Sequence, residues 1–447
     1  MAKLNWQALL AIFTLTLSVF PELFDLIMLA NYGDPIVVAG AGLGVMFINM
    51  FVYGTFEGLN GAIDTLVSQY FGAKDYTSCN RIYNKARIIN TVIFVPISLI
   101  LIFSDKLLIL LDQDPEVAVI TQRFVTYQLP GLYSITMYDT LRRFLQAQGS
   151  FELPVIGLVL TNIFHIVSLA LALKYIEYDP VIITALITNV SMIFDFLILR
   201  YLAANDLVKT NFLSIFDGAF DDWREYLGLA LPSAFIICAE WWMYEVLAIF
   251  AGLLGVMYLS VIVIIFNTHN FVYDISYGLS QAASSMIGRT LAESGKFEAK
   301  KLLASITMIQ TVLCIIMTTI YLTCSRQIIN TFSDDEKIID LYMDCNLLII
   351  SMFLIDSTQI VIGGVIRGLG EQEDSSIISF VAYALITLPM SLLLSFYFDF
   401  NIKGILFAYI MGIVFNSVFN IYLLYKSDWE LAIEETIVAD MKSDTTI

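Results

Sequence analysis

Long apolar segments separated by short polar stretches run through most of the chain. About 20 apolar residues are enough for a helix to cross a bilayer, and many of these segments reach that length. The pattern predicts an all-α integral membrane protein with twelve transmembrane helices. The expected spans are 7–30, 36–70, 82–104, 118–147, 152–175, 181–204, 225–252, 255–290, 298–324, 337–368, 375–397 and 402–425. The first contains Glu22 and Asp25 and has no evident cleavage site, so we interpret it as a span and not as a signal peptide.

Two stretches of sequence recur in the same order in the two halves of the chain. GLNGAIDTLVSQYFGAKDYTSC from Gly58 resembles GLSQAASSMIGRTLAESGKFEA from Gly278 at an offset of 220, and RFLQAQG from Arg143 resembles RGLGEQE from Arg367. Each half has six expected helices, so the two repeats share one orientation in the membrane. We therefore expect two six-helix lobes around a central cavity. The expected divisions are an N-terminal lobe at 1–204, a cytosolic linker at 205–224, a C-terminal lobe at 225–426 and an acidic cytosolic tail at 427–447.

Composition and charge narrow the function further. The chain is 58% hydrophobic with a formal net charge of −18, which argues against binding to nucleic acid. Most of its 23 Lys and Arg residues lie in alternate loops or near the termini, which predicts that both termini are cytosolic. The two histidines and five scattered cysteines indicate neither a metal cluster nor a disulfide framework. The sequence lacks the ATP-binding motif GxxxxGK[ST], so we expect any active transport to use an ion gradient. It also lacks the catalytic motifs GxSxG and HExxH, so we do not expect an enzyme.

Acidic residues inside the predicted spans are the main candidates for function. A charged carboxylate at the bilayer centre costs roughly 2.5–3.5 kcal/mol, so such groups face the protein interior or a wet cavity, or bind a proton. The candidates are Asp25, Glu57, Asp195, Glu240, Glu245, Asp274 and Asp356. For Asp195 and Asp274 a structural role fits the sequence equally well. Glu240 and Glu245 are about 140° apart around their helix, so one can face the cavity and the other a lobe interior, although both could be hydrogen-bonded core acids.

Aromatic residues gather around Glu240 in the seventh and eighth spans. They are Trp241, Trp242, Tyr244, Phe266, Tyr273 and Tyr277. Aromatic faces beside a carboxylate suit an organic cation, because each cation–π contact contributes about 0.5–2 kcal/mol. The alternative explanation is that Trp and Tyr also concentrate at membrane interfaces.

The same segments resemble the multidrug and toxic compound extrusion (MATE) transporters, in particular the eukaryotic branch of that family. The resemblance covers nearly the whole chain. It is carried by GLNGAIDTLVSQYFGAKDY, RFLQAQ, LPSAFIICAEWWMYE, GLSQAASSMIG and DSTQIVIGGVIRGLG, and the pattern around CAEWWMYE is the most specific. It implies two six-helix lobes around a cavity, and a secondary antiporter that expels organic cations or other small molecules in exchange for protons or sodium ions.

The resemblance also implies roles for individual residues. In the eukaryotic branch the acid of the EWW motif and an acid of the tenth span form the cation and proton site of the second lobe, and they match Glu240 and Asp356. A second acid of the seventh span, an asparagine of the second span and a tyrosine of the eighth span match Glu245, Asn49 and Tyr273.

Some positions depart from the family pattern. A tyrosine of some animal members is Phe266 here, which removes a hydroxyl near the expected substrate. Asp25 aligns with a first-lobe acid that is more typical of prokaryotic members. Its expected partners form an Asn-x-x-x-Asp pair, of which Asn162 is present while the second position is Ile166. The resemblance implies no role for Glu57.

Together these observations predict an antiporter that exports organic cations in exchange for protons by alternating access. The expected coupling residues are Glu240, Asp356, Glu245 and Asp25, and the expected substrate-binding residues are Glu240, Trp241, Tyr244, Tyr273, Phe266 and Asn49. Sodium coupling is the nearest alternative, followed by a flippase for lipid-linked or anionic molecules; a passive channel and a membrane enzyme fit less well. We expect no metal or cofactor, and a monomer among the lipids of a plasma membrane or a vacuole-type membrane.

Overall fold

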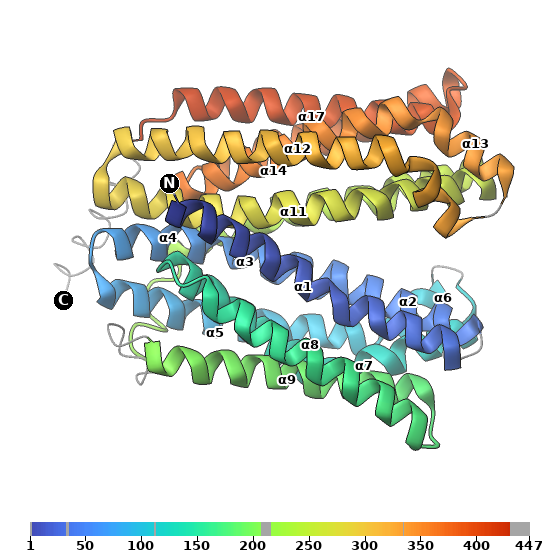
Figure 1. Ribbon diagram of the computed structural model, residues 1–447, viewed down its shortest axis with the longest axis horizontal. Coiled ribbons are helices and arrows are strands. Elements are labelled where there is room, and N and C mark those ends of the chain that lie inside the picture. Colours follow the sequence, from blue (N-terminus) through green and yellow to red (C-terminus); the bar gives the residue numbers. More distant parts are fainter. Residues whose placement is uncertain (1, 33–34, 111–112, 207–215, 334, 430–447) are drawn as a thin grey trace. The chain divides into compact units, whose positions relative to one another are not determined.

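The computed structural model describes residues 2–32, 35–110, 113–206, 216–333 and 335–429. Within these ranges the secondary structure consists of helices without β-strands (Figure 1), which confirms the predicted all-α class. The chain forms two compact units, which we call the first lobe (residues 13–230) and the second lobe (residues 1–12 and 231–447). The division lies inside one helix at Ala230–Leu231, a few residues beyond the predicted linker at 205–224. Residues 207–215 of that linker and 430–447 of the predicted tail lie outside the described residues.

The first lobe contains most of α1 and all helices up to α9. Its elements are α1 (Ala2–Tyr32), α2 (Pro35–Ile48), η1 (Asn49–Tyr53), α3 (Gly54–Leu59), α4 (Gly61–Gly72), α5 (Tyr76–Ile102), α6 (Ser104–Leu110), α7 (Pro115–Ala147), α8 (Glu152–Tyr175) and α9 (Pro180–Asp206). The segment η1 is a short π-helix inside the predicted second span. Such π-helical turns frequently occur at functional sites, and this one begins at the predicted binding residue Asn49.

The second lobe begins within α10. Its elements are α10 (Arg224–Leu254), α11 (Val256–Ser294), α12 (Lys296–Phe332), α13 (Glu336–Asp344), α14 (Asn346–Leu369), α15 (Gln372–Phe380), η2 (Val381–Thr387), α16 (Leu388–Leu392), η3 (Leu393–Tyr397) and α17 (Asn401–Lys426). The predicted span at 337–368 is wrong at its start. The helix is interrupted at Cys345, which separates α13 from α14. The nine residues of α13 include four charged ones, so this short helix is too polar to continue the span.

Eleven helical stretches among the described residues are long and apolar enough to cross a membrane. The remaining predicted span, 118–147, coincides with α7, a helix of 33 residues that includes Asp139, Arg142 and Arg143. These polar residues lower the mean hydropathy of α7, which explains why it is not among the eleven apolar stretches. Its length is nevertheless sufficient, since a helix rises 1.5 Å per residue and a bilayer core is about 30 Å thick.

Several helix ends follow directly from local sequence. Asp75 accepts hydrogen bonds from the backbone N–H groups of Thr77 and Ser78 and so begins α5. Asp114 acts in the same way before α7, whose first residue is Pro115. Gly295 separates α11 from α12 with φ 77°, a conformation that a glycine adopts without the steric cost of a side chain.

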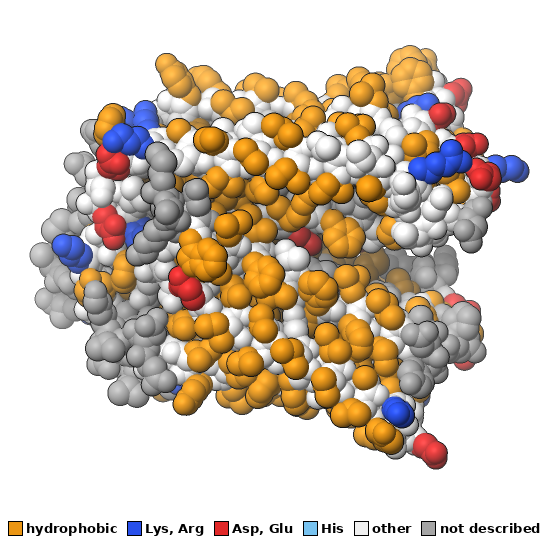
Figure 2. Space-filling model, viewed as in Figure 1, with side chains coloured by type: hydrophobic (Ala, Val, Ile, Leu, Met, Phe, Trp, Pro, Cys, Tyr) orange, Lys and Arg blue, Asp and Glu red, His pale blue; other side chains and the backbone are white. Residues whose placement is uncertain are grey.

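Large apolar side chains cover the outside of the helices. Figure 2 shows hydrophobic side chains along the middle of the helices and most Lys, Arg, Asp and Glu side chains near their ends. The helix α12 is the clearest case, with Met308, Val312, Ile315, Ile316 and Ile320 all exposed. A soluble protein does not expose apolar surface of this extent, whereas a bilayer solvates it. The chain is therefore a multi-pass membrane protein.

Within the second lobe, α11 and α14 pack at an unusually short distance. A β-carbon added to Gly364 would lie 2.2 Å from the carbonyl oxygen of Ser280, and one added to Gly368 would lie 2.6 Å from that of Ser284. Small residues four apart allow the backbones of membrane helices to approach closely. This packing holds the two helices that carry His269 and Asp356 in one register.

Candidate functional site

The carboxylate of Asp356 lies at the centre of a buried polar network in the second lobe. Nε2 of His269 is 2.6 Å from Oδ2 of Asp356, and the hydroxyls of Tyr244 and Tyr409 each donate to the same oxygen at 3.4 Å. The two hydroxyls are also 2.8 Å apart, within hydrogen-bond distance. Asp356 and His269 are both completely buried. Four helices, α10, α11, α14 and α17, therefore meet at one carboxylate.

Glu240 on α10 is the second buried acid of this lobe. Its side chain is 4% exposed, and its Oε1 atom has no hydrogen-bond partner among the described residues. The charges that act on it are those of Asp356 and Arg367, and the hydroxyl of Tyr383 is a polar neighbour. The structure thus brings the two principal predicted coupling acids, Glu240 and Asp356, into one electrostatically connected cluster.

The predicted aromatic residues of the second lobe lie around these acids. Nε1 of Trp241 donates a hydrogen bond of 3.1 Å to the hydroxyl of Tyr273. The ring of Phe266 contacts Tyr244 edge to face, with centroids 4.8 Å apart. Trp242 differs from its neighbour, because it is 43% exposed on the outside of the helix. Trp241 therefore belongs to the cluster and Trp242 to the lipid-facing surface.

Two other predicted residues occupy separate positions. Glu245 is half-buried on α10, whereas Glu240 is buried, in agreement with the angle of about 140° between them. Asn49 lies in the first lobe, at the start of η1, where its Nδ2 donates a hydrogen bond of 3.3 Å to Oε1 of Glu22. Glu22 was not among the sequence candidates.

In the first lobe, Asp25 of α1 has a histidine partner of its own. Oδ1 of Asp25 lies 2.9 Å from Nε2 of His165, and Oδ2 accepts a hydrogen bond of 2.7 Å from Thr188. The other ring nitrogen of His165 is 3.0 Å from the hydroxyl of Ser191. Both oxygens of the acid and both nitrogens of the imidazole are therefore engaged.

The partners that the sequence suggested for Asp25 are placed elsewhere. Nδ2 of Asn162 donates to the carbonyl oxygen of Leu17 at 2.9 Å, and Ile166 is 37% exposed. His165 thus takes the place of the expected Asn-x-x-x-Asp pair. Asp195 forms a different contact, since it accepts a hydrogen bond of 3.1 Å from Thr161.

Glu57 belongs to a buried ionic network of the first lobe. Arg143 lies 2.5 Å from Asp64 and 3.1 Å from Asp139, and its third acidic neighbour is Glu57 at 3.8 Å. Arg142 also pairs with Asp139. Paired charges of this kind hold helices together, because removal of one partner leaves an uncompensated buried charge. This network explains why an acid occurs at position 57 inside an apolar span.

The main residues that sequence reasoning missed are the two histidines. Each is completely buried, and each contacts one of the predicted coupling acids. On the sequence alone, His165 and His269 are considered only as possible metal ligands. The available signal was their position inside apolar spans, because ionisable residues there are rare and usually functional. Within the described residues, no three His, Cys, Asp or Glu side chains form a potential metal-binding group.

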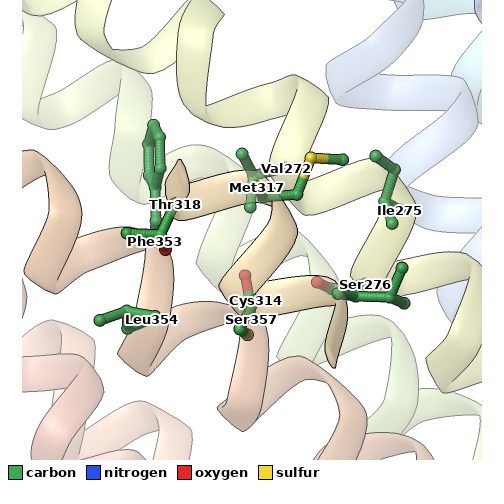
Figure 3. A pocket seen from close by; sticks show the side chains of 10 residues that line it. Val272, Ile275, Ser276, Cys314, Met317, Thr318, Phe353, Leu354 and Ser357 are labelled. Carbon is green, nitrogen blue, oxygen red and sulfur yellow. The ribbon is translucent and has the colours of Figure 1, made fainter. Parts of the chain in front are cut away.

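A small pocket lies between α11, α12 and α14 (Figure 3). It is lined by Val272, Ile275, Ser276, Leu313, Cys314, Met317, Thr318, Phe353, Leu354 and Ser357. Phe353 is also the ring that stacks on His269, with an interplanar angle of 13°. The pocket thus borders the Asp356 network but contains none of the residues predicted to bind substrate.

Comparison with known proteins agrees with this architecture. The MatE family model matches residues 11–171 and 232–393, one segment in each half of the chain. Multidrug and toxin extrusion protein 2 of Oryctolagus cuniculus is 29% identical over 402 residues, which are 89% of this chain and 66% of that protein. Protein DETOXIFICATION 3 of Arabidopsis thaliana is 27% identical over 90% of this chain and 85% of its own length.

Solved structures share the fold. The eukaryotic MATE transporter AtDTX14 superposes with a TM-score of 0.90 at 23% identity, covering 97% of each chain. Such MATE structures have twelve helices in two repeats, as the sequence predicted for this chain. Because the family model matches most of the chain, the chain belongs to the MatE family, whose members are membrane transporters.

Proposed function

We propose that this transporter exports organic cations in exchange for protons. The observation that carries the proposal is the buried pair of acids in the second lobe, Glu240 and Asp356, surrounded by aromatic rings and hydrogen-bond donors. Two buried carboxylates that act on each other electrostatically attract either a proton or a cationic ligand. An exchange of one for the other follows from that competition.

The aromatic residues define the class of substrate. Tyr244 and Tyr273 lie near Glu240. Phe266 contacts Tyr244 and Trp241 donates to Tyr273, and each ring over a cation contributes about 0.5–2 kcal/mol. A carboxylate beside several rings therefore favours a cation that is itself partly aromatic. The names of relatives, which refer to multidrug and toxin extrusion, are consistent with a wide range of such substrates.

The donors around Asp356 favour a proton over a sodium ion. One oxygen of this carboxylate faces an imidazole nitrogen and two hydroxyls, from His269, Tyr244 and Tyr409. Sodium is a hard cation that prefers oxygen ligands, as other hard cations do, and an imidazole nitrogen beside the carboxylate is a poorer ligand for it. A proton, in contrast, is accommodated by a shift within the existing hydrogen bonds.

The proposed cycle alternates between two charge states of the site. With Glu240 and Asp356 ionised and open to the cytosol, the cation binds between carboxylate and rings. After the site becomes open to the opposite side, protonation removes the negative charge and the cation dissociates. The protonated carrier then returns. One proton exchanged for one cation sustains about a tenfold gradient per pH unit, since one pH unit corresponds to about 1.4 kcal/mol.

We extend the proposal to Asp25 as a proton site of the first lobe and to Glu245 as a second acid of α10. Asp25 is 3% exposed, and His165 beside it can share a proton. Asn49 is proposed to contribute its amide to the substrate from the first lobe. The transporter is proposed to act as a monomer among membrane lipids, with cytosolic termini, in a plasma membrane or a vacuole-type membrane.

The decisive experiment measures uptake of a radiolabelled organic cation into proteoliposomes under an imposed pH gradient. Uphill uptake that is driven by protons and abolished in Glu240→Gln supports the proposal. The matched control is Glu298→Gln, which neutralises an exposed glutamate paired with Lys301 on α12. Uptake that ignores the pH gradient and follows a sodium gradient shows sodium coupling. Normal uptake by Glu240→Gln shows that this acid is structural and that the proposed mechanism is wrong.

A further inference from the structure

The imidazole of His269 is enclosed beside Asp356 by several close contacts. Its Nε2 atom is 2.6 Å from the carboxylate, and its ring stacks on Phe353 at a centroid distance of 5.5 Å. Tyr244 and Tyr273 contact the ring at their edges, with centroids 6.0 and 6.5 Å away. The orientation of the ring is therefore determined by contacts from three helices.

Three polar atoms of this cluster have no hydrogen-bond partner within the described part of the chain: Nδ1 of His269, Oδ1 of Asp356 and Oε1 of Glu240. The first-lobe pair differs, because each nitrogen of His165 and each oxygen of Asp25 has a partner. Buried polar atoms are usually hydrogen-bonded, so these three leave the second-lobe cluster with capacity for a further proton or polar ligand. The two histidine–aspartate pairs thus differ in how completely their polar atoms are hydrogen-bonded.

The internal repeat gives an independent comparison. Position 269 corresponds to position 49 at the repeat offset of 220. Asn49 also donates a side-chain N–H to a buried acid, Glu22, at 3.3 Å. Both repeats therefore place a side-chain nitrogen against a carboxylate at this position. An amide does not bind a proton at physiological pH, whereas an imidazole does, and only the second repeat has the imidazole.

We propose that His269 and Asp356 together hold the proton that leaves when an organic cation binds. This inference rests on the proposed exchange function and assigns its proton to a residue pair that the sequence did not suggest. With the proton bound, the pair is an imidazolium and a carboxylate and has no net charge. When the cation binds, the proton leaves to water from Nδ1. The pair then has one negative charge, which balances the charge of the cation.

Other titratable groups surround this pair. They are Tyr244 and Glu240 on α10, Tyr273 on α11, Tyr321 on α12, Tyr342 on α13, Arg367 on α14, Tyr383 in η2 and Tyr409 on α17. The tyrosines are acidic only at high pH and arginine stays charged, so Glu240 is the one competitor for the proton in this group near neutral pH. A test must therefore separate His269 from Glu240.

The test counts protons released into weakly buffered detergent solution when ethidium, a planar aromatic cation, binds to the purified transporter. In His269→Gln the side-chain amide can still donate to Asp356 but cannot hold a proton. We expect this variant to release one proton fewer than wild type. Each proton released on binding makes the affinity for ethidium rise tenfold per pH unit. The rise per pH unit should therefore be tenfold smaller in His269→Gln than in wild type. Phe353→Leu is the control, because it disturbs the ring beside His269 without removing a titratable group, and it should release the wild-type number.

A second measurement does not depend on a variant of His269 that folds. The chain has two histidines, so 13C-histidine NMR of protein purified with a histidine-free tag gives two ring signals, and His165→Gln assigns them. Addition of ethidium should change the His269 signal from imidazolium to neutral imidazole. An unchanged signal, or a wild-type proton count from His269→Gln, overturns the assignment to His269 and leaves the exchange function intact. Absence of proton release from the wild type contradicts both.

Discussion

Nε2 of His269 and Oδ2 of Asp356 lie 2.6 Å apart, although 87 residues separate them in the chain. The contact depends on the close approach of α11 and α14, because both residues lie on the facing sides of these helices.

The packing of α11 against α14 can be tested at two adjacent glycines. Gly364→Ala would place a β-carbon 2.2 Å from a backbone oxygen of Ser280, so the helices must separate. We expect a large loss of thermal stability in detergent and loss of cation transport. Gly363→Ala is the control, because the nearest atom to its β-carbon is 3.9 Å away, on Arg367. Equal behaviour of the two variants contradicts this account of the packing.

The two hydroxyls beside Asp356 should act as a pair. Tyr244 and Tyr409 donate to the carboxylate and bind each other, so replacing one by Phe leaves the other in place. We expect each single variant to lose about 1 kcal/mol of unfolding free energy and the double variant to lose an amount that differs from the sum. Thermal unfolding of all four proteins measures the coupling. Strict additivity indicates that the hydroxyls act independently.

Trp241 should contribute to affinity for aromatic cations. Trp241→Ala removes a ring near Glu240 and the N–H that orients Tyr273. Loss of one cation–π contact predicts binding of ethidium that is roughly 2- to 30-fold weaker. Trp242→Ala is the neighbouring control, since that side chain is exposed on the outside of the helix. Fluorescence titration distinguishes the two variants, and similar affinities for both would place the substrate elsewhere.

The buried ions of the first lobe should determine stability more than transport chemistry. Asp139→Asn removes the acid that Arg142 and Arg143 share. Breaking a buried ion pair costs about 3–5 kcal/mol, so we expect a markedly lower melting temperature in detergent. The protein that remains folded should keep the wild-type dependence of transport on pH. A change in that dependence with unaltered stability is the opposite result and indicates a role in proton coupling.

Asp25 is expected to add a proton to the exchange. At zero membrane voltage, each coupled proton contributes about a tenfold accumulation per pH unit. Asp25→Asn should therefore lower the steady-state cation gradient in proteoliposomes by about tenfold at a gradient of one pH unit. Thr188→Val removes a hydrogen bond to the same carboxylate and keeps the acid, so it serves as the control. If both variants sustain the wild-type gradient, Asp25 has a structural role only.

The sequence alone determined the architecture. Apolar segments of sufficient length must form helices in a membrane, because a helix satisfies its own backbone hydrogen bonds there. The repeat predicted the similarity of the two halves, and the position of Glu240 and Asp356 inside apolar spans made them functional candidates. Charged side chains in apolar spans are conspicuous without any knowledge of their neighbours.

The tertiary structure decided which side chains meet. No sequence pattern indicates that His269 contacts Asp356, that His165 takes the place of the missing partner of Asp25, or that Glu57 serves the arginines at 142 and 143. These contacts join helices far apart in the chain, and their formation depends on helix rotation and on close approach at Gly364. Hydrophobic periodicity specifies that a residue lies in a span; only the packing of the helices determines which hydrogen-bond partner it finds there.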